Sequence, residues 1–519
     1  MIEDTPNTPS KWPLALLRSP QLSSVRTSLV LLFTASFLYF NLFVFGGVPV
    51  LLGDDQVFFW MDAQRMLYGE HPYIDFFQYT PPGTDVLFLA GFKLFGPRTW
   101  VLNAIVLALG TALCWVCFRL ANQVLPHRQA LLATLLYLVL IFSKALDATH
   151  HWFSVLAVMC AVLLLMRQSS RPRVLLSGAL LGVAAFFTQT HGIAAVLALS
   201  ALLACEELVA KRNWRTFFAN PALLILAFAL SLLALNAHFI ASAGARNLWY
   251  EQVVYVHRYA PRLWDIPNLG LPASPSWHTL TLVAQQVFVY LMLPLVYALT
   301  LLRFRIKSNG PPHWGCRKLL LLSVVGIVLI LEVAISPNWL RVYAVSMPGI
   351  ILLVWLVQRL GKSRRHLIAV LYCGVALLAL RQLWSRHHQD FIICELPAGR
   401  TAALPQTCDE LLWIARHTKP GDFFFQADWP GMYVPLALRN PLYLDTVGTN
   451  QQTRPEYVDL AIRQLEERKV RYVLWSRRLD NPDSVRDPAN PLAPLKAYLL
   501  SGYDPVEDFP GPEELWQRK

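Results

Sequence analysis

Long apolar stretches alternate with short polar segments from residue 27 to about residue 385. A helix that crosses the hydrocarbon core of a membrane needs about 20 mainly apolar residues, and this rule predicts about eleven spans. They lie at 27–52, 98–121, 129–146, 152–167, 174–190, 192–210, 219–241, 279–302, 318–336, 341–359 and 366–384. Val86–Phe95 is too short to span, so we expect an interfacial or re-entrant helix there.

The composition supports this interpretation. Hydrophobic residues make up 55% of the 519 positions and charged residues only 15%, against about 25% charged residues in a soluble domain. The mean hydropathy is +0.41. The net charge of +12 is explained by cytoplasmic loops rich in Lys and Arg. No zinc-finger cysteine pattern or basic arm indicates nucleic-acid binding.

Lys and Arg cluster in alternate loops, which predicts the orientation. The clusters include Arg119 and Arg128, Arg171 and Arg173, Lys211 and Arg212, Arg303 and Arg305, and Arg364 and Arg365. By the positive-inside rule, the N-terminal segment is cytoplasmic and an odd number of spans leaves the C-terminal part outside. We therefore expect a multi-pass protein of the cell (inner) membrane. Its first span serves as an uncleaved signal anchor, because residues 1–25 lack a signal-peptide pattern.

The composition changes after Arg386. Short strands are predicted at 421–426, 441–444 and 471–476, and helices at 432–438 and 454–469. The expected fold is an α-helical polytopic membrane protein with a small external (periplasmic) α/β domain. Its parts are a cytoplasmic segment at 1–26, a transmembrane domain at 27–385 and the external domain at 386–519. Cys394 and Cys408 lie in the part of the chain expected in the oxidising compartment. Their spacing is compatible either with a disulfide or with two free thiols.

Two adjacent acids, Asp54 and Asp55, open the first external loop, Leu51–Pro82. Carboxylates at the water end of a span are costly without a use. One can act as a general base while the other binds or orients substrate. Mutual repulsion would raise one of the two pKa values. The alternative is a solvated cap of the following helix.

A second polar group, Asp147 with His150 and His151, lies between the third and fourth predicted spans. One face of a helical turn can present an acid and a histidine three or four positions apart. Such a trio can bind substrate, transfer protons or simply cap a helix. A lone His-His pair with no further ligand at the right spacing is weak evidence for metal. We therefore expect neither a metal site nor a cofactor.

Further candidate substrate contacts are external cations and aromatic residues. Arg341 and Tyr343 start a late span, where an arginine can bind a phosphate with two parallel hydrogen bonds or simply extend to the interface. Lys93, His257 and Arg258 lie in other external segments. They suit a sugar with a lipid phosphate, or an ordinary interfacial belt.

The middles of the spans hold few ionisable residues, with Glu332 as the main exception. An ion-coupled transporter usually needs such residues near the midplane. The pattern favours an enzyme that works at the external leaflet. A lipid-linked sugar flippase or exporter and a non-catalytic assembly subunit remain the alternatives.

Three segments carry a family resemblance: Ala63–Tyr73 (AQRMLYGEHPY), Tyr79–Pro82 (YTPP) and Leu94–Gly96 (LFG). With the preceding acids, they make the chain similar to the GT-C membrane glycosyltransferases, in the branch of protein O-mannosyltransferases and the lipid A aminoarabinose transferase. The resemblance implies a polyprenyl-phosphate-sugar donor, an inverting transfer to a lipid, glycan or protein, and Asp54 or Asp55 as base.

The resemblance also suggests roles for other residues. Asp147 would match the second acidic position and Arg341 the cation that holds the donor phosphate, with Tyr79 among the substrate contacts. The chain departs from the pattern at Thr188, where a basic residue is often expected.

Overall fold

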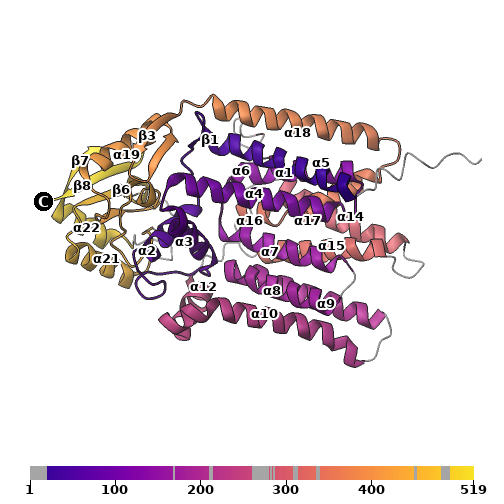
Figure 1. Cartoon of the computed structure of the whole chain (residues 1–519). Coiled ribbons are helices and arrows are strands. Elements are labelled where there is room, and N and C mark those ends of the chain that lie inside the picture. Colours follow the sequence, from indigo (N-terminus) through magenta and orange to yellow (C-terminus); the bar gives the residue numbers. More distant parts are fainter. Residues whose placement is uncertain are drawn as a thin grey trace, which may run out of the picture.

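A computed structural model describes the chain over residues 20–167, 170–209, 214–259, 280, 283, 287–307, 314–334, 339–448, 453–480 and 491–519. Most of these residues form a bundle of apolar helices, with a mixed domain at one end (Figure 1). The N-terminal segment, the start of the eighth predicted span and most of the loop before it lie outside the described residues.

The bundle helices follow the predicted apolar stretches. They are α1 (Pro20–Leu42), α4 (Thr99–Ala121), α5 (His127–Leu136) with η2 (Tyr137–Phe142) and α6 (Ser143–Ala145), α7 (His150–Leu165), α8 (Arg171–Phe187), α9 (Gln189–Val209), α10 (Trp214–Ala243), η4 (Val287–Met292) with α14 (Leu293–Lys307), α15 (Trp314–Val333), α16 (Trp339–Ala344), α17 (Met347–Gln358) and α18 (Arg364–His387). Among the described residues, five helices are long and apolar enough to cross a membrane, and further apolar helices are shorter. The number of crossings stays a prediction.

Two predicted spans have different boundaries in the structure. The first helix ends at Leu42, because residues 43–50 form the hairpin of β1 (Phe43–Val44) and β2 (Val48–Pro49). Its turn uses Gly46 and Gly47 at φ +73° and +120°, a region that favours glycine. The stretch 341–359 is divided into α16 and α17, and α17 has a proline in its first turn, where no amide donor is needed.

The external elements gather at one end of the bundle (Figure 1). The first loop forms α2 (Gln56–Leu67), and α3 (Gly83–Phe95) follows it directly. The segment after α10 forms α11 (Ala245–Trp249), η3 (Tyr250–Tyr255) and α12 (Val256–Tyr259). Both lie at the same end as the C-terminal domain, which agrees with the predicted common side.

The C-terminal domain is the predicted α/β unit. A sheet in the order β5-β6-β8-β7 has one parallel pair, β5 with β6, and is otherwise antiparallel. The elements are β3 (Ile392–Leu396), β4 (Gly399–Ala403), α19 (Pro405–His417), β5 (Phe424–Gln426), α20 (Tyr433–Leu436), α21 (Pro455–Glu467), β6 (Tyr472–Ser476), η5 (Arg477–Asp480), α22 (Ala493–Gly502), β7 (Tyr503–Asp508) and β8 (Glu513–Arg518).

The strand predicted at 441–444 is wrong. This segment forms a series of bends, and its backbone hydrogen bonds are made to partners outside the sheet of the domain. The amide of Tyr443 donates to Gln464 Oε1 (2.7 Å), and its carbonyl accepts the amide of Phe77 (2.8 Å). The segment therefore joins the first external loop to α21. Cys394 and Cys408 form a disulfide between β3 and α19.

Backbone and side-chain contacts hold the domain on the first loop. Leu51 donates its amide to the carbonyl of Ala402 (2.8 Å). Met61 of α2 is buried in the hydrophobic core of the domain, and Phe77 is buried among the side chains under α21. The loop that carries the acid pair is thus packed between the bundle and the domain.

Candidate active site

The acid pair sits where the chain turns into α2. Asp54 is exposed and has φ +60°, an uncommon conformation for a residue other than glycine. Asp55 is half-buried at the N-cap position of α2, but its side chain makes no capping hydrogen bond. Burial, followed by the charge of Asp54, raises the pKa of Asp55, while Arg341 opposes the rise. A structural cap therefore does not account for Asp55.

Asp147 lies in the loop between α6 and α7, and Gln56 of α2 holds this loop. Gln56 Oε1 accepts the amide of Ala148 (3.2 Å), and its Nε2 donates to the carbonyl of Leu146 (3.4 Å). Asp147 is fully buried, and its carboxylate oxygens lack a well-aligned hydrogen bond among the described residues. Burial and then the charges of Asp55 and Asp54 raise its pKa well above the usual range. Burial and the two neighbouring acids thus both favour the protonated form of Asp147.

A row of three histidine side chains extends from this site into the bundle. The ring centroids of His150 and His151 are 3.9 Å apart, and those of His151 and His191 are 5.3 Å apart. His191 of α9 is buried, and its Nε2 lies 3.0 Å from Oε2 of Glu332 in α15. His191 was not among the candidates predicted from the sequence. Two signals pointed to it: the break between α8 and α9 at Thr188, just before His191, and Glu332 as the main ionisable residue within the spans.

Arg341 supplies the positive charge of this site. It is half-buried on α16, and its charge acts on Asp55, on His150 and on Glu332. Tyr79 has 39% of its surface exposed and is within electrostatic reach of both Asp55 and Arg341. The structure thus brings the acid pair, Asp147, the histidines, Tyr79 and Arg341 together.

The other candidates are not part of this group. Tyr343 lies on α16 two residues after Arg341, but it is buried in the hydrophobic core of the bundle. Lys93 is exposed near the end of α3, and His257 and Arg258 are exposed on α12. The helices α3 and α12 differ from the elements that carry the acid pair, Asp147 and Arg341. Among the described residues, no group of three or more His, Cys, Asp or Glu side chains is arranged to hold a metal ion.

A second polar network, which the sequence did not reveal, centres on Gln78 of the first loop. Its Nε2 donates to Oδ2 of Asp62 (2.8 Å) and of Asp85 (2.9 Å). Its amide donates to Oε2 of Glu251 (2.8 Å), which also accepts the hydroxyl of Tyr443 at Oε1 (2.8 Å). The network joins α2, α3, η3 and the C-terminal domain. It joins the middle of α2, at Asp62, to the start of α3, at Asp85.

Burial shapes the charges of this network. It raises the pKa of Asp62 and Asp85 well above the usual range, and that of Glu251 to about 7. Asp445 of the domain, which shares a hydrogen bond with Asp62, has a pKa of about 7 for the same reason. Arg65 lies 3.6 Å from Asp445 Oδ1 and limits that rise. Burial therefore favours the protonated forms of these carboxyls, which reduces the repulsion between them.

Comparisons with known proteins show which proteins the chain resembles. The family model described as dolichyl-phosphate-mannose-protein mannosyltransferase matches residues 79–240. ArnT from Cupriavidus metallidurans bound to undecaprenyl phosphate superposes with a TM-score of 0.58 at 15% identity, over 96% of this chain and 98% of ArnT. The chain has the GT-C glycosyltransferase fold.

A more distant relative of the fold agrees. The archaeal oligosaccharyltransferase AglB from Archaeoglobus fulgidus, in complex with an inhibitory peptide and a dolichol-phosphate, gives a TM-score of 0.52 at 12% identity, over 88% of this chain and 70% of AglB. None of the curated proteins matches the chain significantly. The predicted α-helical fold with a small C-terminal α/β domain is therefore confirmed. The five long apolar helices of the described residues support an integral membrane location.

Proposed function

We propose that this GT-C glycosyltransferase moves a sugar from a polyprenyl-phosphate donor to a lipid, glycan or protein acceptor at the external face of the cell (inner) membrane. The donor class is supported by the polyprenyl phosphates bound to ArnT and AglB, which share the fold. The proposed orientation has the N-terminal segment in the cytoplasm and residues 386–519 outside. It is supported by the loop charges and by the common end of the external elements. The proposed domain boundary near 385 is supported by the end of α18 at His387.

The observation that carries the proposal is the acid pair within electrostatic reach of Arg341 and of the buried Asp147. Asp54 or Asp55 takes the proton of the acceptor hydroxyl or amine as that atom attacks the anomeric carbon. The bond from this carbon to the phosphate oxygen breaks, and the lipid phosphate leaves with the bonding electrons. Arg341 neutralises the charge that develops on the phosphate. Asp147, protonated, donates a hydrogen bond to the sugar.

The test uses purified protein in liposomes with radiolabelled polyprenyl-phosphate sugars and membrane extract as acceptor source. The wild type is compared with Asp54→Asn and Asp55→Asn, which keep the shape of the side chain and remove the base. We expect transfer to a new product, with a loss of at least about a hundredfold in one variant. Equal turnover in all three proteins would refute the acid assignment.

The same assay separates the alternatives. A flippase would move the labelled lipid across the membrane without forming product, equally in wild type and both variants. An assembly subunit would neither move the labelled lipid nor form product, whether or not it binds the lipid.

A further inference from the structure

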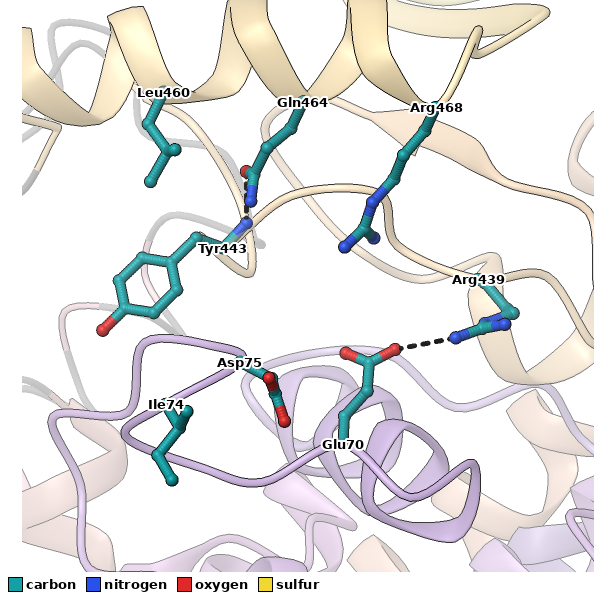
Figure 2. A pocket seen from close by; sticks show the side chains of 8 residues that line it. All are labelled: Glu70, Ile74, Asp75, Arg439, Tyr443, Leu460, Gln464 and Arg468. Atoms are coloured by element: carbon teal, nitrogen blue, oxygen red, sulfur yellow. Dashed lines mark hydrogen bonds and ion pairs between the residues drawn. The ribbon is translucent and has the colours of Figure 1, made fainter. Parts of the chain in front are cut away.

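A pocket of about 560 Å³ opens between the first external loop and the C-terminal domain (Figure 2). Three of its lining residues follow α2, and five belong to the domain, most of them on α21 or in the segment before it. Since α2 has 12 residues and rises by about 1.5 Å each, this pocket lies roughly 18 Å from the acid pair. It is therefore a separate site from the proposed transfer centre.

The domain side of the pocket holds two guanidinium groups on one aromatic ring. The Cζ atoms of Arg439 and Arg468 lie 4.9 Å and 4.7 Å from the ring centroid of Phe423. These cation–π contacts restrain both guanidinium groups before any ligand arrives. Figure 2 shows both side chains directed toward Glu70 across the pocket. The groups are therefore pre-arranged, and they are close enough to repel each other.

The carboxylate that faces them is already shared. Glu70 accepts from Arg65 Nε (2.8 Å) and from Arg439 Nη2 (3.2 Å). Arg468 makes no side-chain hydrogen bond or ion pair to any described residue, and its Nη1 is a buried donor without a partner. Asp75, on the loop side, accepts the amide of His71 (2.7 Å). Arg468 is thus left with unused donors that suit an anionic oxygen.

The rest of the pocket offers the surfaces that a sugar ring needs. Ile74 has 48% of its surface exposed, and Leu460 faces it from α21. Gln464 accepts the amide of Tyr443 at Oε1, which leaves its two N–H groups as donors. Tyr443 is itself held by its bond to Glu251. Apolar surfaces for a ring face therefore lie next to donors for hydroxyl oxygens.

We propose that this pocket binds an acidic sugar residue of the acceptor, with its carboxylate or phosphate on Arg468 and its ring between Ile74, Leu460 and Tyr443. The identification of the ligand as acceptor rests on the proposed function, whereas the binding itself does not. A ligand held here contacts both the first loop and the domain. It secures the acceptor at one end of α2 while the reactive group reaches the acids at the other.

The test is direct binding to the whole protein in detergent, without donor, measured by calorimetry. The probes are three trisaccharides that differ only in the terminal residue: glucuronic acid, glucose 6-phosphate or glucose. We expect at least one acidic probe to bind about tenfold or more tightly than the neutral one, because a charge-assisted hydrogen bond discriminates by about that factor. The tighter of the two acidic probes identifies the anionic group.

Variants identify the residue responsible. Arg468→Gln should reduce the affinity for the acidic probe about tenfold, and Arg468→Lys, which keeps the charge, should restore part of it. Arg463→Gln, an exposed arginine on the same helix, is the matched control and should leave the affinity unchanged. Asp54→Asn should also leave it unchanged, so a failure of the transfer mechanism is distinguishable from a failure of this site. Equal affinity for all probes, no binding, or an equal loss in Arg463→Gln would overturn the proposal.

Discussion

The Gln78 network makes a sharp prediction about how the first loop is held. In Gln78→Leu, the side chain keeps about its size but loses the donors to Asp62 and Asp85. It also loses the acceptor of the Thr80 amide (3.1 Å) and of the Thr80 hydroxyl (2.8 Å). Asp62 and Asp85 are both at most 1% exposed, so water does not replace the lost partner. Two buried carboxyl groups are left with an unmade bond each.

Each such group costs about 1–3 kcal/mol, so the two together destabilise the packed loop by roughly 2–6 kcal/mol. The lower value corresponds to a loss of about thirtyfold in protection from local opening. Hydrogen exchange measured by mass spectrometry on peptides that cover 56–85 and 439–447 would detect this. Peptides from α4 and α7, in the bundle, should keep their protection.

The matched control is Gln64→Leu. Gln64 is equally buried on α2, but its Nε2 has no hydrogen-bond partner among the described residues. Its replacement should therefore leave the exchange of the loop within a factor of a few of the wild type. Protection in Gln78→Leu that is indistinguishable from wild type, or a loss of the same size in Gln64→Leu, would refute the reasoning.

Three further predictions concern charge and the disulfide. Burial raises the pKa values of Asp445 and Glu251 to about 7, from about 4 in the unfolded chain. Between about pH 4 and pH 7 the folded state therefore binds more protons than the unfolded state. The stability of the docked domain, measured by thermal melting, should fall as the pH rises over this range. A melting temperature that rises over this range would contradict the sign. In the proposed mechanism Asp147 donates a hydrogen bond as the protonated acid, so Asp147→Asn, whose amide N–H can replace that donor, should keep donor affinity within about threefold. Asp147→Leu should weaken donor affinity about tenfold or more, as seen by titration with labelled donor. Equal effects of the two variants would exclude a hydrogen-bonding role. Replacing Cys394 and Cys408 by Ser should destabilise the domain by about 3 kcal/mol, because the bridge closes a loop with a sequence separation of 14, and unchanged melting of the domain would contradict this.

The parts of the fold that could be predicted from sequence depend on local pattern. Apolar runs located the bundle helices, and the acids at the end of the first run located the candidate site. The boundary at residue 52 failed because β1 and β2 are as apolar as the helix before them. The glycine pair at 46–47 and Pro49 are the residues that distinguish the hairpin from a continued span.

Long-range partners explain what the sequence did not show. Gln78 is linked to Glu251 across 173 positions, and Arg439 to Glu70 across 369. Nothing near Gln78 in the chain marks it as the centre of a network. His191 and Glu332 likewise meet only because α9 packs against α15. Spacing within a motif carries no information about such pairs.

The docking of the C-terminal domain on the first loop also has a consequence for biosynthesis. The helix that begins at the acid pair emerges from the ribosome early, while Ala402, Arg439 and Tyr443, which contact its loop, are translated more than 300 residues later. The bundle can insert into the membrane before these partners exist. In a nascent chain the first loop is therefore held by the bundle alone, and its contacts with the C-terminal domain form only after the bundle has been synthesised.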